Sequence, residues 1–191
     1  MRDLCTLRPF RLCASHDTGK SAMNAEAQAG KQAQPEPHAL RALQAEDHDV
    51  LREIYLEAVQ HADPAVYSPA QCLAWSHWAD QLQGSLLRGQ GLVSCGKDGH
   101  AEAFGLRDPA DRIALLYCRP RSQRQGRARQ LLRALERQAL DGGCRHLRTE
   151  ASLLSQPLFS AEGWQVSWRE ALLIEGVPFR RFRMHKQLQA N

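Results

Sequence analysis

The stretch RIALLYCRPRSQRQGRARQLLRALERQALD, residues 112–141, decides the fold of this chain. Its first part, residues 113–118, is an apolar run that is too short for a helix and is soon followed by Pro120, so it predicts a buried strand. Its last part repeats apolar residues at helical spacing, at Ala128, Leu131, Leu132, Leu135 and Ala139. Gly142 and Gly143 come directly afterwards, where glycine commonly ends a helix. The stretch therefore predicts a strand, a loop and an amphipathic helix.

The loop between the predicted strand and helix has the composition of an anion site. The first turn of a helix carries unpaired N–H groups and the positive end of the helix dipole. Gly126 allows the backbone to approach a ligand closely, and the small Ala128 leaves that approach open. Positive charge around this turn comes from Arg121, Arg124, Arg127 and Arg129. The loop predicts a phosphate site, although it matches neither the P-loop nor the three-glycine dinucleotide pattern.

The composition fits one globular domain. The chain has 191 residues, 43% of them hydrophobic and 24% charged, which is ordinary for a soluble protein. No apolar run approaches the length of a membrane span, and the first residues lack a secretory apolar core. The six cysteines are scattered without a C-x-x-C pair, and the eight histidines show no zinc-binding spacing. We therefore expect a cytoplasmic protein with reduced cysteines, no membrane association and no metal site.

A modest positive charge comes mainly from arginine. The formal net charge is +4, and the arginines concentrate around residues 119–148 and 180–183. Such a cluster can bind nucleic acid, but no nucleic-acid motif is present and aromatic residues do not alternate with the arginines. An anionic cofactor explains the cluster more simply, so we expect no nucleic-acid partner. The alternative, a nucleic-acid-binding protein, predicts an affinity that falls steeply with salt.

Residues 1–37 differ from the rest of the chain. They are rich in Ala, Gln, Gly, Ser and Pro and show no sustained periodicity, which predicts a disordered leader. A second interpretation is that translation naturally starts at Met23 and that residues 1–22 result from a start site placed too far upstream. We expect a single domain over residues 38–188.

The remaining patterns predict further strands and helices. A strand over residues 39–43 precedes a helix that Asp47 or Asp49 caps and that Asp63 and Pro64 end. Other strands are predicted over residues 91–95, 101–106, 144–151, 165–174 and 177–186, and another helix over residues 157–163.

Two details of this pattern are specific enough to test. Ser68, Pro69 and Gln71 form a capping box that starts a second helix, with an apolar stripe at Cys72, Trp75, Trp78, Ala79 and Leu82. In the last hairpin, Phe179 and Phe182 are out of phase with strand alternation, which predicts a bulge.

Two segments resemble motifs of the GCN5-related N-acetyltransferases, the GNAT family. The family motif Gln/Arg-x-x-Gly-x-Gly/Ala matches residues 123–128, which lie between the predicted strand and helix. A later motif, Asn-x-x-Ala-x-x-Phe-Tyr-x-x-x-Gly-Phe, is similar to residues 152–164. The resemblance covers about residues 39–186. It implies a mixed α/β fold with a central, mostly antiparallel sheet flanked by helices.

The resemblance also implies acetyl-CoA as co-substrate. In the family the central strand separates from its parallel neighbour, and pantetheine pairs with the exposed strand backbone, here at Leu116, Tyr117 and Cys118. The pyrophosphate would lie on N–H groups of the loop, at Gln123, Arg124, Gln125, Gly126, Arg127 and Ala128. Either Arg121 or Arg129 would meet the adenosine 3′-phosphate, unless both are solvated charges.

The implied reaction is direct transfer of an acetyl group to an amine. A backbone N–H, that of Cys118, would polarise the thioester carbonyl. Many members protonate the departing thiolate with a Tyr, whose place beside the cofactor is taken here by Phe159. If that protonation limits turnover, Phe159→Tyr is expected to raise the rate. Residues 113–118 contain no carboxylate, so Glu102 and Glu150 on the neighbouring strands are the candidate bases.

The acceptor is an unidentified amine, carried by a small molecule or a protein. In the family the helices after the first strand shape the acceptor pocket. The Tyr-Ser-Pro-x-Gln-x-x-x-Trp segment over residues 67–75 is similar to the same segment in a bacterial subgroup of small acetyltransferases. Tyr67 and Trp75 are therefore candidate acceptor-binding residues, together with His77 and Trp78, although tryptophans at helical spacing are more often core. We expect a monomer or homodimer. The alternative function is a catalytically weak module that binds acyl-CoA as a sensor or partner.

Overall fold

The computed structural model describes residues 38–189. The predicted leader over residues 1–37 and the alternative start at Met23 lie outside the described residues. The boundaries expected for the domain, residues 38–188, stay a prediction.

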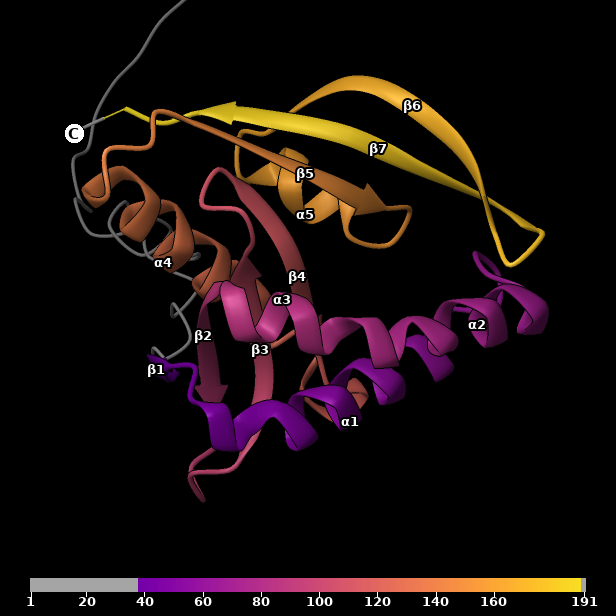
Figure 1. Cartoon of the computed structure of the whole chain (residues 1–191), viewed down its shortest axis with the longest axis horizontal. Helices are drawn as coiled ribbons and strands as arrows, with labels where there is room; N and C mark the ends of the chain where they lie inside the picture. Colours follow the sequence, from indigo (N-terminus) through magenta and orange to yellow (C-terminus); the bar gives the residue numbers. More distant parts are fainter. Residues whose placement is uncertain (1–37, 190–191) are drawn as a thin grey trace, which may run out of the picture. The chain divides into compact units, whose positions relative to one another are not determined.

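The strands of the described residues form a seven-stranded sheet in the order β1-β2-β3-β4-β5-β7-β6 (Figure 1). They are β1 (Ala39–Ala42), β2 (Gln90–Cys95), β3 (Ala101–Arg107), β4 (Arg112–Cys118), β5 (His146–Ser152), β6 (Gln165–Ile174) and β7 (Val177–Gln187). Among these strands, only β4 and β5 are parallel neighbours. The predicted mixed, mostly antiparallel sheet is confirmed, and the helix after β4 makes the crossover that a parallel pair requires.

Helices cover both faces of the sheet (Figure 1). They are α1 (His48–Gln60), α2 (Pro69–Ser76), α3 (Leu82–Arg88), α4 (Arg127–Asp141) and α5 (Gln156–Ala161), with short 3-10 turns η1 (Ala45–Asp47), η2 (His77–Gln81) and η3 (Pro120–Ser122). On one face, Leu131 and Leu135 of α4 share a core with Ile113. On the other face, Ile54 of α1 shares a core with Phe104. Helices α4 and α1 therefore lie on opposite sides of the central strands.

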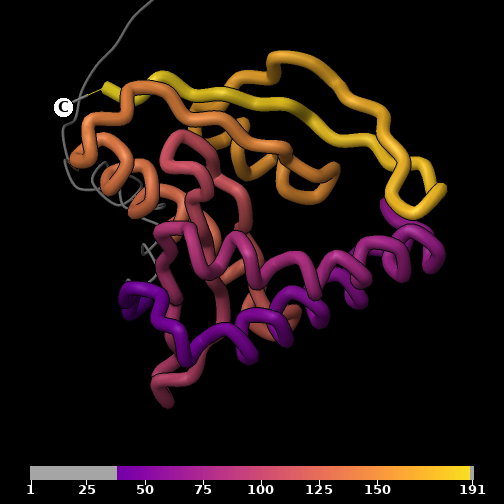
Figure 2. The backbone as a smooth tube through the Cα atoms, in the orientation of Figure 1, coloured from indigo at the N-terminus to yellow at the C-terminus, as the bar shows by residue number. Residues whose placement is uncertain are grey.

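The parallel strands β4 and β5 pair only where they begin. Their register contains Arg112 opposite Arg148 and Ile113 opposite Thr149, and no later residues. Beyond this point the strands run apart, as Figure 2 shows. Beyond Ile113 the edge of β4 that faces β5 is therefore unpaired, and we call the place where the two strands separate the opening.

The helix starts confirm one capping prediction and correct another. Ser68 Oγ accepts a hydrogen bond from the Gln71 N–H at 3.3 Å, and Gln71 Oε1 accepts one from the Ser68 N–H at 2.9 Å, so α2 begins with the predicted capping box. Asp47, in contrast, does not cap α1 with its side chain. Its buried carboxylate accepts hydrogen bonds from Arg41 at 2.6 Å. It also accepts one from the Gln44 N–H at 2.8 Å, so Asp47 caps the 3-10 turn η1 just before α1 and pairs with the nearby Arg41.

The chain after Ser68 does not form one continuous helix. The predicted apolar stripe is divided among α2, η2 and α3. Helix α1 likewise ends at Gln60, before the expected stop at Asp63 and Pro64.

In the last hairpin no bulge separates Phe179 from Phe182, although their phase predicted one. Phe179 packs in a small core with Tyr67, whereas Phe182 packs against the core of α4. The two rings therefore use opposite faces of β7, as side chains three positions apart in a strand do. The register shift of this hairpin lies elsewhere, between Val166 and Trp168 of β6.

Candidate active site

The loop between β4 and α4 presents unpaired backbone N–H groups. Gly126 is the N-cap of α4 with φ +85°, and no side chain caps this helix end. The first intrahelical bond runs from the Gln130 N–H to the Gly126 carbonyl at 3.0 Å, so the N–H groups before Gln130 have no partner within the helix. Arg124 also has a left-handed backbone, with φ +60°. Loops with left-handed residues gather N–H groups into anion-binding nests, which fits the predicted pyrophosphate site.

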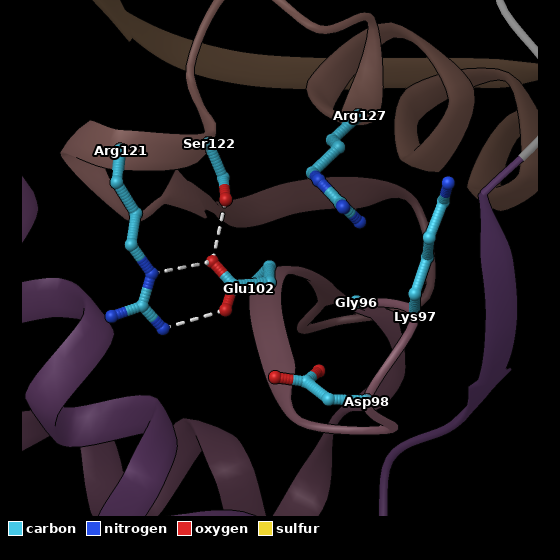
Figure 3. Close-up of a pocket in the computed structure, with 7 residues that line it drawn as sticks. All are labelled: Gly96, Lys97, Asp98, Glu102, Arg121, Ser122 and Arg127. Atoms are coloured by element: carbon cyan, nitrogen blue, oxygen red, sulfur yellow. Dashed lines mark hydrogen bonds and ion pairs between the residues drawn. The ribbon is translucent and has the colours of Figure 1, made fainter.

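The buried carboxylate of Glu102, on β3, is bonded to this loop. The Glu102 carboxylate accepts hydrogen bonds from Arg121 Nη2 at 2.6 Å, from Arg121 Nε at 3.2 Å and from the Ser122 hydroxyl (Figure 3). Together with Arg127 and the turn over residues 96–98, these residues line a pocket of about 330 Å³. The hydrogen bonds from Arg121 hold the pKa of Glu102 below its usual range. Glu102 is therefore charged and fixed in place.

These contacts change the role predicted for Glu102. A base must lie where the amine enters, whereas the Glu102 carboxylate, on β3, lies in the pocket at the phosphate loop and is bonded there to Arg121 and Ser122. A lowered pKa also weakens it as a proton acceptor. We do not propose Glu102 as the base.

The arginines around the loop differ in their availability. The Arg127 side chain is buried, and its Nη1 donates to Ser94 Oγ and to the Cys95 carbonyl, both at 2.9 Å. Arg129 pairs with Glu162 at 2.8 Å. Arg121 and Arg129, the two candidates for the 3′-phosphate, thus both have carboxylate partners, while Arg127 can contribute its backbone N–H only.

One contact of the loop was not predicted. His38, just before β1, has its Nε2 2.8 Å from the Gln125 carbonyl. Its backbone N–H donates to Gln130 Oε1 at 3.0 Å, and Gln130 Nε2 donates to the His38 carbonyl at 2.7 Å. The start of the domain therefore supports the loop and the first turn of α4. No sequence pattern indicates this contact, because the residues are far apart in the chain.

The backbone N–H and C=O groups of β4 point alternately toward β3 and toward the opening. The Arg119 N–H donates to the Glu102 carbonyl on β3 at 2.9 Å. Bonded and non-bonded pairs alternate along antiparallel strands, so Tyr117 is again bonded to β3, whereas Leu116 and Cys118 turn their N–H and C=O groups toward the opening. Of the three predicted pantetheine partners, Leu116 and Cys118 fit the prediction, and Tyr117 does not because β3 takes its backbone groups.

The Cys118 thiol is not activated as a nucleophile. Burial raises the pKa of its thiol to about 11, and the side chain packs against the core of α4. A thiol with this pKa is protonated at neutral pH. The part of Cys118 that can act on a thioester is its backbone N–H.

A cavity of about 240 Å³ lies beside the opening, between α2, β4, β5 and the β6–β7 hairpin. Its aromatic lining is Tyr55, Tyr67, Trp75, Trp78, Tyr117 and Phe179. Its polar lining is Gln81, Ser85, Arg112, Glu150, Ser152, Arg180 and Arg181. Because β4 and β5 both contribute side chains, the cavity adjoins the place where the two strands separate. Of the predicted acceptor residues, Tyr67, Trp75 and Trp78 line it, whereas the exposed His77 pairs with Glu175 at 2.6 Å.

The rings of this cavity are held firmly. The rings of Tyr67 and Trp75 meet edge to face at 5.3 Å between centroids, and Trp75 meets Phe179 in the same way at 6.2 Å. The Tyr67 hydroxyl accepts a hydrogen bond from the Leu153 N–H at 3.0 Å. Gln71 Nε2 donates to the Pro178 carbonyl at 2.8 Å and joins α2 to β7. The aromatic wall is thus shaped before any acceptor enters.

Glu150 lies in the polar part of the cavity. Its carboxylate accepts a hydrogen bond from Arg112 Nε at 2.7 Å, and Arg183 pairs with its other oxygen. Glu150 is therefore the predicted base that reaches the acceptor side of the opening. Its role in catalysis stays a prediction.

Comparison with known proteins gives the family. Residues 65–186 match a family model described as an acetyltransferase (GNAT) domain, which is more than half of the chain. The chain belongs to the GNAT family. No curated protein matches its sequence.

Solved GNAT structures share this fold. A GCN5-related N-acetyltransferase from Rhodopseudomonas palustris is 26% identical, with a TM-score of 0.74 over 79% of this chain and 96% of that one. PaiA N-acetyltransferase from Thermoplasma acidophilum, in complex with coenzyme A, is 16% identical, with a TM-score of 0.61 over 78% and 99%. A phosphinothricin acetyltransferase from Sinorhizobium meliloti, in complex with acetyl-CoA, is 18% identical, with a TM-score of 0.60 over 79% and 88%.

Phe159 stands at the GNAT tyrosine position but lies in the core. Its ring is 2% exposed and meets Trp164 edge to face at 5.0 Å. It belongs to the core under α4 rather than to the lining of the aromatic cavity. Its predicted contact with the cofactor therefore finds no support in this geometry.

Two features are absent from the described part of the chain. Residues 38–189 contain no cluster of three or more His, Cys, Asp or Glu side chains that could hold a metal ion. Likewise, none of the helices over these residues is long and apolar enough to cross a membrane.

Proposed function

We propose that this GNAT protein transfers an acetyl group from acetyl-CoA directly to the amine of a small acceptor. The observation that carries the proposal is the opening between β4 and β5, with the N-terminus of α4 at one end and an aromatic cavity alongside. Solved relatives with coenzyme A or acetyl-CoA share this fold and support the choice of co-substrate.

The residues present fit each part of this co-substrate. The free N–H groups around Gly126 suit the pyrophosphate, and the free backbone of Leu116 and Cys118 suits the pantetheine amides. The thioester would then lie within reach of the Cys118 N–H, which donates to the carbonyl oxygen as negative charge develops there. The amine enters from the aromatic cavity, attacks the thioester carbon and loses a proton, and the CoA thiolate departs.

Proton transfer rests on few side chains. Glu150 is the proposed acceptor of the amine proton, through water, because it lines the cavity from β5. Phe159 stands at the family's tyrosine position and has no proton to donate to the departing thiolate. A thiolate is a tolerable leaving group at neutral pH, so solvent can protonate it after departure.

The finer expectations from the sequence belong to the same proposal. We place the chain with the bacterial subgroup that carries the Tyr-Ser-Pro-x-Gln segment, because this segment builds the capping box and the aromatic wall. The sequence left a small molecule or a protein open as the acceptor, and of these we propose the small molecule. No nucleic-acid partner, a cytoplasmic location and a monomer or homodimer complete the proposal. The alternative, a module that only binds acyl-CoA, is not favoured, since such a module does not need an acceptor cavity.

Turnover with a panel of amines tests the function. Release of CoA from acetyl-CoA would be followed with a thiol reagent, and acetylated amines would be identified by mass spectrometry. We expect at least one amine to react, and Gly126→Glu to abolish the reaction by placing bulk and negative charge in the phosphate loop.

Gly143→Glu is the matched control. It adds the same residue at a glycine with φ +83°, at the opposite end of α4. Its turnover should equal that of the wild type. Binding of acetyl-CoA without turnover of any amine would instead support the acyl-CoA-binding module.

A further inference from the structure

The polar end of the aromatic cavity carries an excess of arginine. Side chains alternate there in one network: Arg112 pairs with Glu150, Glu150 with Arg183, Arg183 with Glu170, and Glu170 with Arg181. Three guanidinium groups thus share two carboxylates. Arg180 also lines the cavity, and among residues 38–189 no carboxylate lies within ion-pairing distance of it. The cavity is therefore positively charged.

Arg181 is the member of this network with free donors. It lines the cavity from β7, and its side chain is 23% exposed. Only its Nε is bonded within the described residues, to Glu170, and no protein group accepts from Nη1 or Nη2. Arg183, in contrast, uses Nε, Nη1 and Nη2 on the two carboxylates. The guanidinium of Arg181 consequently keeps two N–H-bearing nitrogens for a ligand.

The remainder of the cavity selects a small apolar group. Its walls are the mutually packed rings of Tyr67, Trp75 and Phe179. Its volume of about 240 Å³ is below the range of roughly 300–1,000 Å³ that is usual for drug-sized ligands. An acceptor that fits has a compact apolar part and an anionic group close to its amine.

We propose that the acceptor is a free α-amino acid with an apolar side chain, whose carboxylate binds Arg181. This rests on the proposed function. Arg181 lies directly opposite Ser152, the last residue of β5, and so next to the opening where the thioester is attacked. A carboxylate held there leaves the neighbouring amino group at the opening and the side chain against the rings. The planar guanidinium suits a carboxylate in geometry as well as in charge.

Matched pairs of amines test this proposal. L-Leucine would be compared with isopentylamine, and L-phenylalanine with phenethylamine, because each pair differs only in the carboxylate. We expect a wild-type kcat/KM at least about ten-fold higher for the amino acid of a pair, as a hydrogen bond to a charged group implies. Leucinamide, which resembles the N-terminus of a peptide, should react as poorly as isopentylamine and so distinguishes a free amino acid from a polypeptide end.

Variants test whether Arg181 causes the preference for amino acids over amines. Arg181→Ala should reduce the ratio within each pair to near one, mainly through KM of the amino acid. Arg169→Ala is the control, since Arg169 lies on the same hairpin over the Phe182 ring and does not line the cavity. It should keep the wild-type ratio.

Each other outcome overturns the proposal. A wild-type ratio near one, a ratio that survives in Arg181→Ala, or leucinamide as good as leucine would do so. If acetyl-CoA stabilises the protein but neither member of any pair reacts, the acceptor class is wrong and the acetyl-CoA site stands. If acetyl-CoA does not bind at all, the proposed function itself fails.

Discussion

At the scale of single residues, location decides which charged groups can take part in chemistry. Glu102 and Glu150 both looked like candidate bases, and both lie on strands next to β4. The structure separates them, because Glu102 is tied to the phosphate loop by Arg121 and Ser122, whereas Glu150 lines the acceptor cavity. The first is a positioning residue, and the second stays a candidate for catalysis.

Replacing Glu102 tests its positioning role. Glu102→Gln removes the charge that holds Arg121, and the loop should lose its fixed shape. We expect acetyl-CoA affinity, measured by calorimetry, to fall about ten-fold, in line with the loss of charged hydrogen bonds. Electrostatic repulsion alone predicts a higher acetyl-CoA affinity instead, because the variant lacks a negative charge near the phosphates. The control is Asp98→Asn in the same pocket, which should bind no more weakly than wild type; equal behaviour of the two variants would refute the role.

Phe159→Tyr tests the assignment of the tyrosine position. The ring is 2% exposed, so a hydroxyl added to it would be buried in the apolar core under α4 without a partner. We expect the free energy of unfolding in urea to fall by about 1–3 kcal/mol, with no gain in turnover. An unchanged stability together with a faster reaction would show that residue 159 faces the thioester, as the sequence resemblance implies.

At the scale of elements, the β6–β7 hairpin is held by charges as well as by its ladder. Glu170 of β6 accepts hydrogen bonds from Arg183 Nε at 2.9 Å and Nη2 at 3.0 Å, and also pairs with Arg181. These hydrogen bonds, chiefly those from Arg183, lower the pKa of Glu170 to about 2. The hairpin therefore depends on Glu170 being ionised.

This dependence predicts a loss of stability in acid. The folded pKa of Glu170 is below its unfolded value, so its contribution is present above about pH 4.3 and is lost as the pH falls toward 2. Glu102 and Asp47, whose pKa values are also lowered, act in the same direction. Glu170→Gln should show a shallower fall in Tm between about pH 5 and pH 2. Asp141→Asn, at the exposed end of α4, should keep the wild-type slope; identical slopes in all three proteins would contradict the account.

Elements could be predicted from the sequence where local signals act alone. The strand before Pro120, the start of α4 at Gly126 and the capping box at Ser68 all follow from neighbouring residues. The exceptions depend on contacts outside the predicted pattern: Asp47 pairs with Arg41 and caps the 3-10 turn η1 rather than α1, and the phase of Phe179 follows from its packing against Tyr67. Periodicity cannot reveal such contacts, since they depend on the arrangement of the whole fold.

At the scale of the whole molecule, segments far apart in the sequence build the site. The phosphate loop follows β4, the aromatic wall comes from α2 and β7, and the polar end comes from β4, β5 and β7. Sequence motifs located the loop because its residues are contiguous. The network from Arg112 to Arg181 carries no such motif, because its members are spread over four strands, β4, β5, β6 and β7. The acceptor side of the site was therefore the harder part to predict.

The measurement that tests the central claim most directly is a thermal melt with and without acetyl-CoA. Ligand at about 100 times its Kd adds roughly 2.7 kcal/mol, which corresponds to a rise in Tm of about 5–10 °C for a domain of this size. We predict this rise for the wild type and Gly143→Glu, and its loss in Gly126→Glu. No rise at millimolar acetyl-CoA, or an equal rise in all three proteins, would contradict an acetyl-CoA site at the loop before α4.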